Sequence, residues 1–276
     1  MFEPPITKED RQNVGSKGKV EIGYVQWASA EASTHIAKEI LEEMDYEVEI
    51  PVLQTGLMYE STATGKIDGF ICSWLPDTDR NYWNKHKDNL VELNNHYESA
   101  QIGLVVPEYV DIDSIDELKD HKEEFQGRIV GIDPGAAQMV VTEDELMPHY
   151  DLDDWTLEES GGPAMTAELS RSISNEEWIV VTGWKPHWKW AEWDLKFLED
   201  PDNIMGDGEF IKSMGRPGIR EDLPEVSAFL ENYTMTTEDL SSVMLEIQDG
   251  VDPEEAAKNF IEENRDKVDE WIPDDM

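Results

Sequence analysis

The sequence predicts an α/β protein that folds as two lobes built on a largely parallel sheet. Strands alternate with helices along most of the 276 residues, which is the pattern of βαβ units. The length suits one large domain or two lobes of ordinary size. Apolar residues make up 39% of the chain and include 10 Trp, 8 Tyr and 7 Phe, so the chain can build a core.

The first block begins with a strand whose residues alternate between apolar and polar. A helix follows, because its apolar residues recur near i, i+3 and i+4. The predicted elements of this block are strands at 20–25, 48–52 and 69–73 and helices at 29–45 and 57–64.

Further βαβ units make up the second block. Its predicted elements are strands at 102–107, 128–132, 155–157 and 178–182 and helices at 114–118, 139–147 and 164–172. A strand at 210–214 and helices at 224–233, 237–249 and 253–271 close the chain. Asp252 and Pro253 form a good helix start, with an N-cap carboxylate and a proline in the first turn.

These elements predict a domain organisation in three parts. Residues 1–17 are expected to be a flexible lead-in, 18–107 plus 209–276 the first lobe, and 108–208 the second lobe. The chain then crosses between lobes twice, which favours a ligand cleft where the carboxyl ends of the strands meet.

The charge excludes several partners. Asp and Glu number 63 and Lys and Arg only 22, so the formal net charge is −41. A surface this acidic repels nucleic-acid phosphates and anionic lipid headgroups. Solubility alone needs a net charge of magnitude about 2–8. The excess favours adaptation to high salt, where surface carboxylates are screened from one another, over an acidic protein of a low-salt organism.

Cysteine content and targeting signals leave the compartment open. Cys72 is the single cysteine, so no intrachain disulfide can form. No apolar run approaches the 18 residues of a membrane span, and residues 1–19 carry no signal-peptide core. Either the protein is cytoplasmic, or the chain begins after a removed export signal or lipid-anchor segment.

Motifs for catalysis, metals and cofactors are missing. The chain contains no H-E-x-x-H, G-x-S-x-G, Walker A or G-x-G-x-x-G sequence. Its six histidines are scattered without metal-binding spacing, at positions 35, 86, 96, 121, 149 and 187. We therefore expect no metal, no cofactor and no enzymatic activity.

Three tryptophans follow predicted strands. Trp27 comes after the first strand, Trp74 after the third and Trp184 after the strand at 178–182. Core packing explains any one of them, but strand ends are where α/β folds present ligand contacts. Together they could wall a cleft for a quaternary ammonium, which binds Trp faces by cation–π attraction of about 0.5–2 kcal/mol per ring.

A second anchor is needed, because a micromolar complex requires about 8 kcal/mol. The segment D-P-G-A-A-Q at 133–138 lies between a predicted strand and a predicted helix. Free N–H groups at such a helix start favour an anion. The alternative, a plain strand–helix turn, stays open when this segment is taken alone.

Four segments then carry a resemblance to a known family. They are G-Y-V-Q-W at 23–27, S-W-L-P at 73–76, G-I-D-P-G at 131–135 and V-T-G-W-K-P-H-W at 181–188. With A-M-T at 164–166 and V-M-L at 243–245, the chain closely resembles the glycine betaine-binding proteins of osmoprotectant ABC importers, from about Lys19 to Trp271.

The resemblance implies a periplasmic-binding-protein-like (type II) fold that closes over its ligand and delivers it to an ABC permease. It implies a trimethylammonium cage of Trp27, Trp74 and Trp184, with the ligand carboxylate held by the backbone amides that follow the Gly135 turn. These are the amides of Ala137 and Gln138, and the side chains expected to support the cage are Tyr24, His187 and Trp188. The expected location is outside the cytoplasm, at the cell surface or in the periplasm, with a membrane tether.

One position departs from the family pattern. The family often has a histidine five residues after the tryptophan of W-L-P, where this chain has Asp79. Three outcomes are open. Asp79 points away and Arg80 or a water takes the place of the histidine, or betaine binds more weakly on the amides alone. In the third, the ligand lacks a carboxylate, as choline does. The first two are favoured because the D-P-G turn is kept. Rival functions are a hydrolase or lyase using the same cleft, and a cytoplasmic or surface sensor.

Overall fold

A computed structural model describes residues 17–206 and 208–273, so the predicted lead-in at 1–17 lies outside the described residues except for Lys17. The chain divides into two compact units. Unit 1 contains the described residues up to Leu75, then Asp79–Glu98, and those from Phe210 onward. Unit 2 contains Pro76–Thr78 and Ser99–Glu209.

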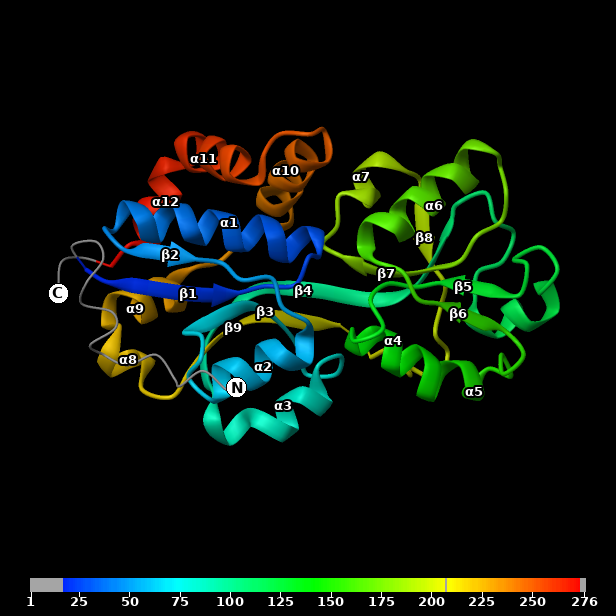
Figure 1. The fold of residues 1–276 in the computed structure, drawn as a ribbon. Helices are drawn as coiled ribbons and strands as arrows, with labels where there is room; N and C mark the ends of the chain where they lie inside the picture. The colour runs from blue at the N-terminus through cyan, green and yellow to red at the C-terminus, as the bar shows by residue number, and fades with distance from the viewer. Residues whose placement is uncertain (1–16, 207, 274–276) are drawn as a thin grey trace. The chain divides into compact units, whose positions relative to one another are not determined.

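Unit 1 is an α/β layer structure whose strands follow the order β2-β1-β3-β9-β4 (Figure 1). β1 pairs in parallel with β2 and β3, whereas β9 is antiparallel to β3. The strands are β1 (Lys19–Gly23), β2 (Glu47–Glu49), β3 (Gly69–Leu75), β9 (Glu209–Gly215) and β4 (Val91–Pro107), which continues into unit 2.

Helices flank the unit 1 strands. α10 and α11 lie against α1 (Figure 1), where fully buried Ile36 and Ile40 form part of the core. The helices are α1 (Ala28–Glu43), α2 (Thr55–Ala63), α3 (Arg80–His86), η1 (Lys87–Asn89), α8 (Ile219–Asp222), α9 (Pro224–Asn232), α10 (Thr237–Gln248), α11 (Pro253–Glu263) and α12 (Arg265–Trp271). None of the helices in the described residues is long and apolar enough to cross a membrane.

Unit 2 has its own strands, in the order β4-β7-β5-β6, with β8 also paired to β4. β5 runs parallel to β6 and β7, and β4 is antiparallel to β7 and β8. The strands are β5 (Arg128–Val130), β6 (Thr156–Glu158), β7 (Val181–Lys185) and β8 (Leu195–Phe197). The helices are η2 (Ile115–His121), α4 (Ala137–Val141), η3 (Thr142–Leu146), α5 (Met147–His149), α6 (Gly162–Ser174) and α7 (Lys189–Glu192).

The α/β class is as predicted, but several details differ. The pairing is mixed, because β9 and β4 enter antiparallel. β4 begins at Val91 rather than at residue 102, and its residues from Ser99 onward cluster with unit 2, because they pair with β7 and β8 there. The predicted helix at 253–271 divides at Asn264 into α11 and α12. The predicted strand at 178–182 lies later, at Val181–Lys185, so Trp184 is inside it.

Candidate functional site in each unit

Trp27 closes the loop between β1 and α1 in unit 1. It is the N-cap of α1, its N–H donates to the Val25 carbonyl at 2.7 Å, and its carbonyl accepts from the Glu31 N–H at 2.8 Å. The side chain is 7% exposed, and its indole Nε1 has no hydrogen-bond partner within the described residues. Tyr24, expected to support the cage, is buried on the same loop with its ring edge-on to His35.

Trp74 is the penultimate residue of β3 and is held by Asp79. The Trp74 N–H donates to Asp79 Oδ2 at 2.9 Å, and the Asp79 N–H donates to the Trp74 carbonyl at 2.8 Å. Tyr59 Oη donates to the same Oδ2 at 3.2 Å and lies 2.5 Å from Ser73 Oγ. Asp79 has no exposed surface. The buried Asp79 carboxylate therefore stabilises the turn after β3 by accepting from the Trp74 backbone.

The D-P-G segment is a turn at Pro134–Gly135 that leads into α4 in unit 2. Ala137 and Gln138 are the first two residues of α4, and no intrahelical carbonyl reaches N–H groups at these positions. A Cβ added at Gly135 would meet nothing within 4 Å, so the turn is open on that side. The N-terminus of α4 can therefore present free donors to an anion.

The Gln138 side chain has a role that sequence reasoning did not identify. Its Nε2 donates to the Gly103 carbonyl of β4 at 3.1 Å and to the Gly183 carbonyl of β7 at 2.9 Å. Gln138 thereby ties the start of α4 to the residue before Trp184. The only sequence signal was its place after the D-P-G turn, which does not show where the side chain bonds.

Trp184 lies opposite Ile102 of β4 and is 4% exposed. Its carbonyl accepts from Trp190 Nε1 at 2.8 Å, whereas its own Nε1 has no hydrogen-bond partner in the part of the chain that the structure describes. The His187 ring stands edge-on to it, with centroids 4.9 Å apart, and Trp188 packs on His187 at 5.2 Å. Of the two supporting residues expected in unit 2, His187 contacts Trp184 and Trp188 contacts His187.

Lys189 also contacts Trp184, and sequence reasoning missed it. Its Nζ lies 4.3 Å from the Trp184 ring centroid, and the residue has no exposed surface. Burial lowers the pKa of Lys189 to about 7. Burial, and secondarily Lys189 itself, lowers the pKa of His187 well below 6.5. A lysine in an acidic chain reads as a surface residue, so only its buried position could reveal the contact.

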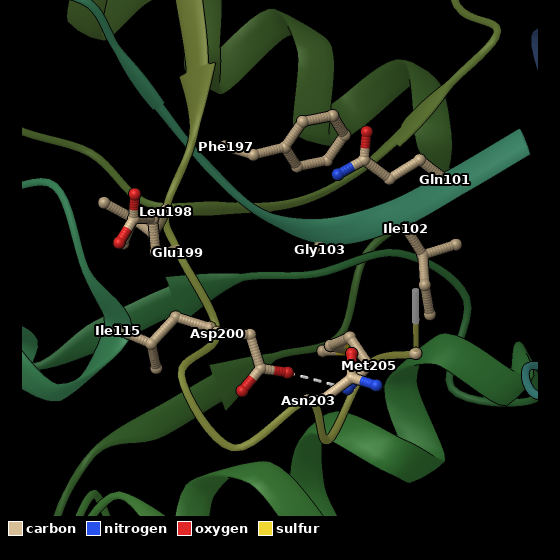
Figure 2. A pocket seen from close by; sticks show the side chains of 11 residues that line it. Gln101, Ile102, Gly103, Ile115, Phe197, Leu198, Glu199, Asp200, Asn203 and Met205 are labelled. Carbon is tan, nitrogen blue, oxygen red and sulfur yellow. Dashed lines mark hydrogen bonds between the residues drawn. The ribbon is translucent and has the colours of Figure 1, made fainter. Parts of the chain in front are cut away.

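Unit 2 also contains a pocket of about 290 Å³ that includes none of the predicted site residues. Figure 2 shows Phe197 and Gln101 on one side of it, and Asp200, which accepts from the Met205 N–H at 2.8 Å, on the other. Asp200 also accepts a hydrogen bond from Tyr150. Its carboxylate is therefore already used in holding the loop after β8.

Comparison with known proteins shows which proteins this chain resembles. Residues 18–263 match the family model OpuAC, described as the substrate binding domain of an ABC-type glycine betaine transport system. A glycine betaine/carnitine transport binding protein, GbuC of Listeria monocytogenes, is 46% identical over 157 residues. That match covers 56% of this chain and 52% of GbuC, so the matched part spans about half the length of that relative.

Solved structures agree over more of the chain. Lactococcal OpuAC in its closed conformation with glycine betaine is 36% identical, with a TM-score of 0.88, and the match covers 92% of this chain and 99% of that one. A choline-binding protein of an ABC transporter, solved with choline, is 26% identical with a TM-score of 0.87 and covers 92% of this chain and 91% of its own. The fold class predicted from the sequence is thereby confirmed.

Proposed function

This chain belongs to the OpuAC family, the substrate-binding domains of ABC-type glycine betaine transport systems, and from that premise we propose that its own ligand is glycine betaine. The ring faces of Trp27, Trp74 and Trp184 hold the trimethylammonium group. The backbone amides of Ala137 and Gln138 hold the carboxylate.

The observation that carries this proposal is the state of two indole N–H groups. A buried tryptophan that serves only packing usually finds a hydrogen-bond partner for its N–H. The Nε1 atoms of Trp27 and Trp184 have none within the described residues, although both side chains are more than nine-tenths buried. A buried indole without such a partner is better explained by a ring whose face is positioned to contact a ligand.

Energetics favour the zwitterion over a simple cation. Three rings contribute roughly 1.5–6 kcal/mol, at about 0.5–2 kcal/mol each. Two charge-assisted hydrogen bonds from the α4 amides add about 1.5–3 kcal/mol each. The total of about 4.5–12 kcal/mol includes the roughly 8 kcal/mol of a micromolar complex. Asp79 does not oppose the ligand carboxylate in this proposal, because Trp74 and Tyr59 engage its Oδ2.

Choline is the second candidate, and one observation favours it. The choline-binding protein described above shares this fold over 92% of the chain. In that case the α4 amides would have no carboxylate to bind, and Asp79 would have to reach the choline hydroxyl from its buried place.

The biological setting is part of the same proposal. A member of this family would meet its ligand outside the cytoplasm and deliver it to the transmembrane permease of an ABC importer, and a membrane tether would keep it close to that permease. The net charge of −41 fits brine, where osmoprotectant uptake is most needed. A hydrolase or a sensor would use the same groups. The sequence contains no recognisable nucleophile–base pair, which argues against the hydrolase.

Titration of tryptophan fluorescence with glycine betaine, choline and proline betaine in molar salt tests the proposal. Trp74→Ala and Trp184→Ala should each raise the Kd about 2- to 30-fold, the loss of one ring contact of about 0.5–2 kcal/mol. Trp178→Phe, which changes a ring that packs on Phe125 and His121, should leave the Kd unchanged. No response to any of these ligands would refute the function. Retained affinity in both Ala variants would refute the cage.

Salt dependence provides an independent check on the same proposal. Contacts with buried rings are screened much less than surface attraction, so the Kd should hold as salt rises to about 1 M. A collapse of affinity would mean that long-range attraction by the acidic surface holds the cation.

A further inference from the structure

Lys189 is the one described lysine with no exposed surface. Its Nζ has no hydrogen-bond partner in the described part of the chain and lies 4.3 Å from the Trp184 ring centroid. A lysine usually keeps its ammonium group in water even when its stem is buried. The unusual position of this amine therefore calls for a role at the ring it covers.

Gly183 makes room for the amine. A Cβ added at Gly183 would lie 3.4 Å from Lys189 Nζ and would clash with Val105 of β4. The Lys189 N–H donates to His187 Nδ1 at 3.0 Å, which fixes the backbone at the start of α7. Gly183 and the Trp184 indole thus border an amine that has no hydrogen-bond partner in the described residues.

Few titratable groups face Lys189. His187 is beside it, and burial lowers the pKa of this imidazole well below 6.5, so it is neutral near neutral pH. Lys185 of β7 lies over a different ring, with Nζ 4.1 Å from the Trp190 centroid. Val105 of β4 and Gln138 of α4 are uncharged. The Lys189 amine lies over the Trp184 ring, and with a pKa of about 7 its charge changes near neutral pH.

We propose that Lys189 is a specificity-determining residue of the cation site, because its amine occupies one face of Trp184 and its charge sets how well the other face accepts a cationic ligand. The proposal rests on the proposed function, in which Trp184 contacts a quaternary ammonium. A ring has two faces, so the ligand must use the one that Lys189 does not cover.

The two forms of the amine act differently on a ligand. An ammonium on one face competes for the negative quadrupole of the ring and repels a second cation across it. A neutral amine does neither. Choline, a net cation, is repelled in full, whereas glycine betaine carries a carboxylate that offsets the repulsion. Protonated Lys189 therefore favours the zwitterion over the cation.

The sign of the pH dependence follows from linkage. A bound cation lowers the pKa of Lys189 further, so binding releases a proton and strengthens as pH rises through about 7. If choline lowers that pKa by about one unit, its affinity rises about fivefold between pH 6 and pH 8.5. Glycine betaine should show a smaller rise over the same range.

The test measures choline and glycine betaine affinity by calorimetry at pH 6 and pH 8.5, in buffers of different ionisation enthalpy. Lys189→Met keeps the apolar volume and removes the charge. It should bind choline at pH 6 about as tightly as the wild type does at pH 8.5, and its binding should release no proton at Lys189. Lys185→Met is the matched control and should keep the wild-type pH dependence. Thermal unfolding of each variant shows that it is folded.

Two results would count against the proposal in different ways. Equal choline affinity of the wild type and Lys189→Met at pH 6, with equal proton release, would refute the role of Lys189 and leave the function standing. Absence of binding of both ligands at both pH values would refute the function itself. If Lys189→Met proves unfolded, Lys189→Gln in the same assay carries the test.

Discussion

Replacing Asp79 tests whether this buried carboxylate shapes the site or contacts the ligand. Its Oδ2 accepts from the Trp74 N–H at 2.9 Å and from Tyr59 Oη at 3.2 Å. Asp79→Ala removes the acceptor for the Trp74 N–H, and an unsatisfied buried donor costs about 1–3 kcal/mol. Tyr59 keeps Ser73 as a neighbour at 2.5 Å, so its share is smaller. We expect a total loss of about 2–4 kcal/mol in the free energy of unfolding.

Asp79→Asn separates the shape of this residue from its charge. The amide oxygen can still accept from the Trp74 N–H, so only the charge-assisted part of the bond is lost, at about 1 kcal/mol. Asp79→Ala also removes the acceptor that holds the Trp74 backbone N–H, so we expect the ring to shift with the backbone. Loss of one ring contact of about 0.5–2 kcal/mol corresponds to a 2- to 30-fold rise in the betaine Kd.

Urea unfolding and ligand titration, both followed by tryptophan fluorescence in molar salt, measure these effects. Asp88→Ala is the matched control, because it removes the same charge from an exposed position in unit 1. If Asp79→Ala unfolds at the wild-type urea concentration and binds betaine normally, the structural role is wrong. If both Asp79 variants keep their stability but lose choline binding selectively, Asp79 contacts the ligand hydroxyl.

Two further predictions concern unit 2. Gly183→Ala should destabilise the protein by about 1–3 kcal/mol, because its Cβ would clash with a β4 side chain, whereas Gly135→Ala should be close to neutral, because nothing lies within 4 Å. Equal urea midpoints for the two variants would contradict this. The second concerns acid: hydrogen bonds from Arg171 and then Arg128 lower the pKa of Glu168 from 4.5 to about 2. A depressed carboxyl pKa contributes stability above the unfolded value that is lost as pH falls from about 4.5 to 2. The melting temperature of Glu168→Gln should therefore fall less over that pH range than that of the wild type. Parallel plots of melting temperature against pH would show that these ion pairs do not contribute.

The local features of the site could be predicted from the sequence. The sequence predicted Trp27, Trp74 and Trp184 at or just after strand ends, and α/β folds bind ligands at strand ends. The structure places Trp74 and Trp184 within the last residues of β3 and β7. The family resemblance is confirmed by the match over residues 18–263. The lobe boundaries and the assignment of individual binding residues stay predictions.

Long-range pairing was beyond sequence reasoning. β4 has 17 residues and neighbours both β9 and β7 in the strand order, and its polar first half does not show the apolar run of its second half. Likewise β9 lies antiparallel to β3, from which it is separated by more than 130 positions in the chain. Periodicity describes one segment at a time, so it cannot report which segments meet.

What the sequence by itself determined is the α/β class, the family and the types of residue available to a betaine site. The tertiary structure decided what three polar residues do: Asp79 closes the turn behind Trp74, the Gln138 side chain joins β4 to β7, and Lys189 covers a face of Trp184. Such roles depend on burial and on partners from other segments. In a chain with 63 carboxylates and 22 Lys and Arg residues, no local pattern distinguishes the few polar side chains that are buried from the many that face water.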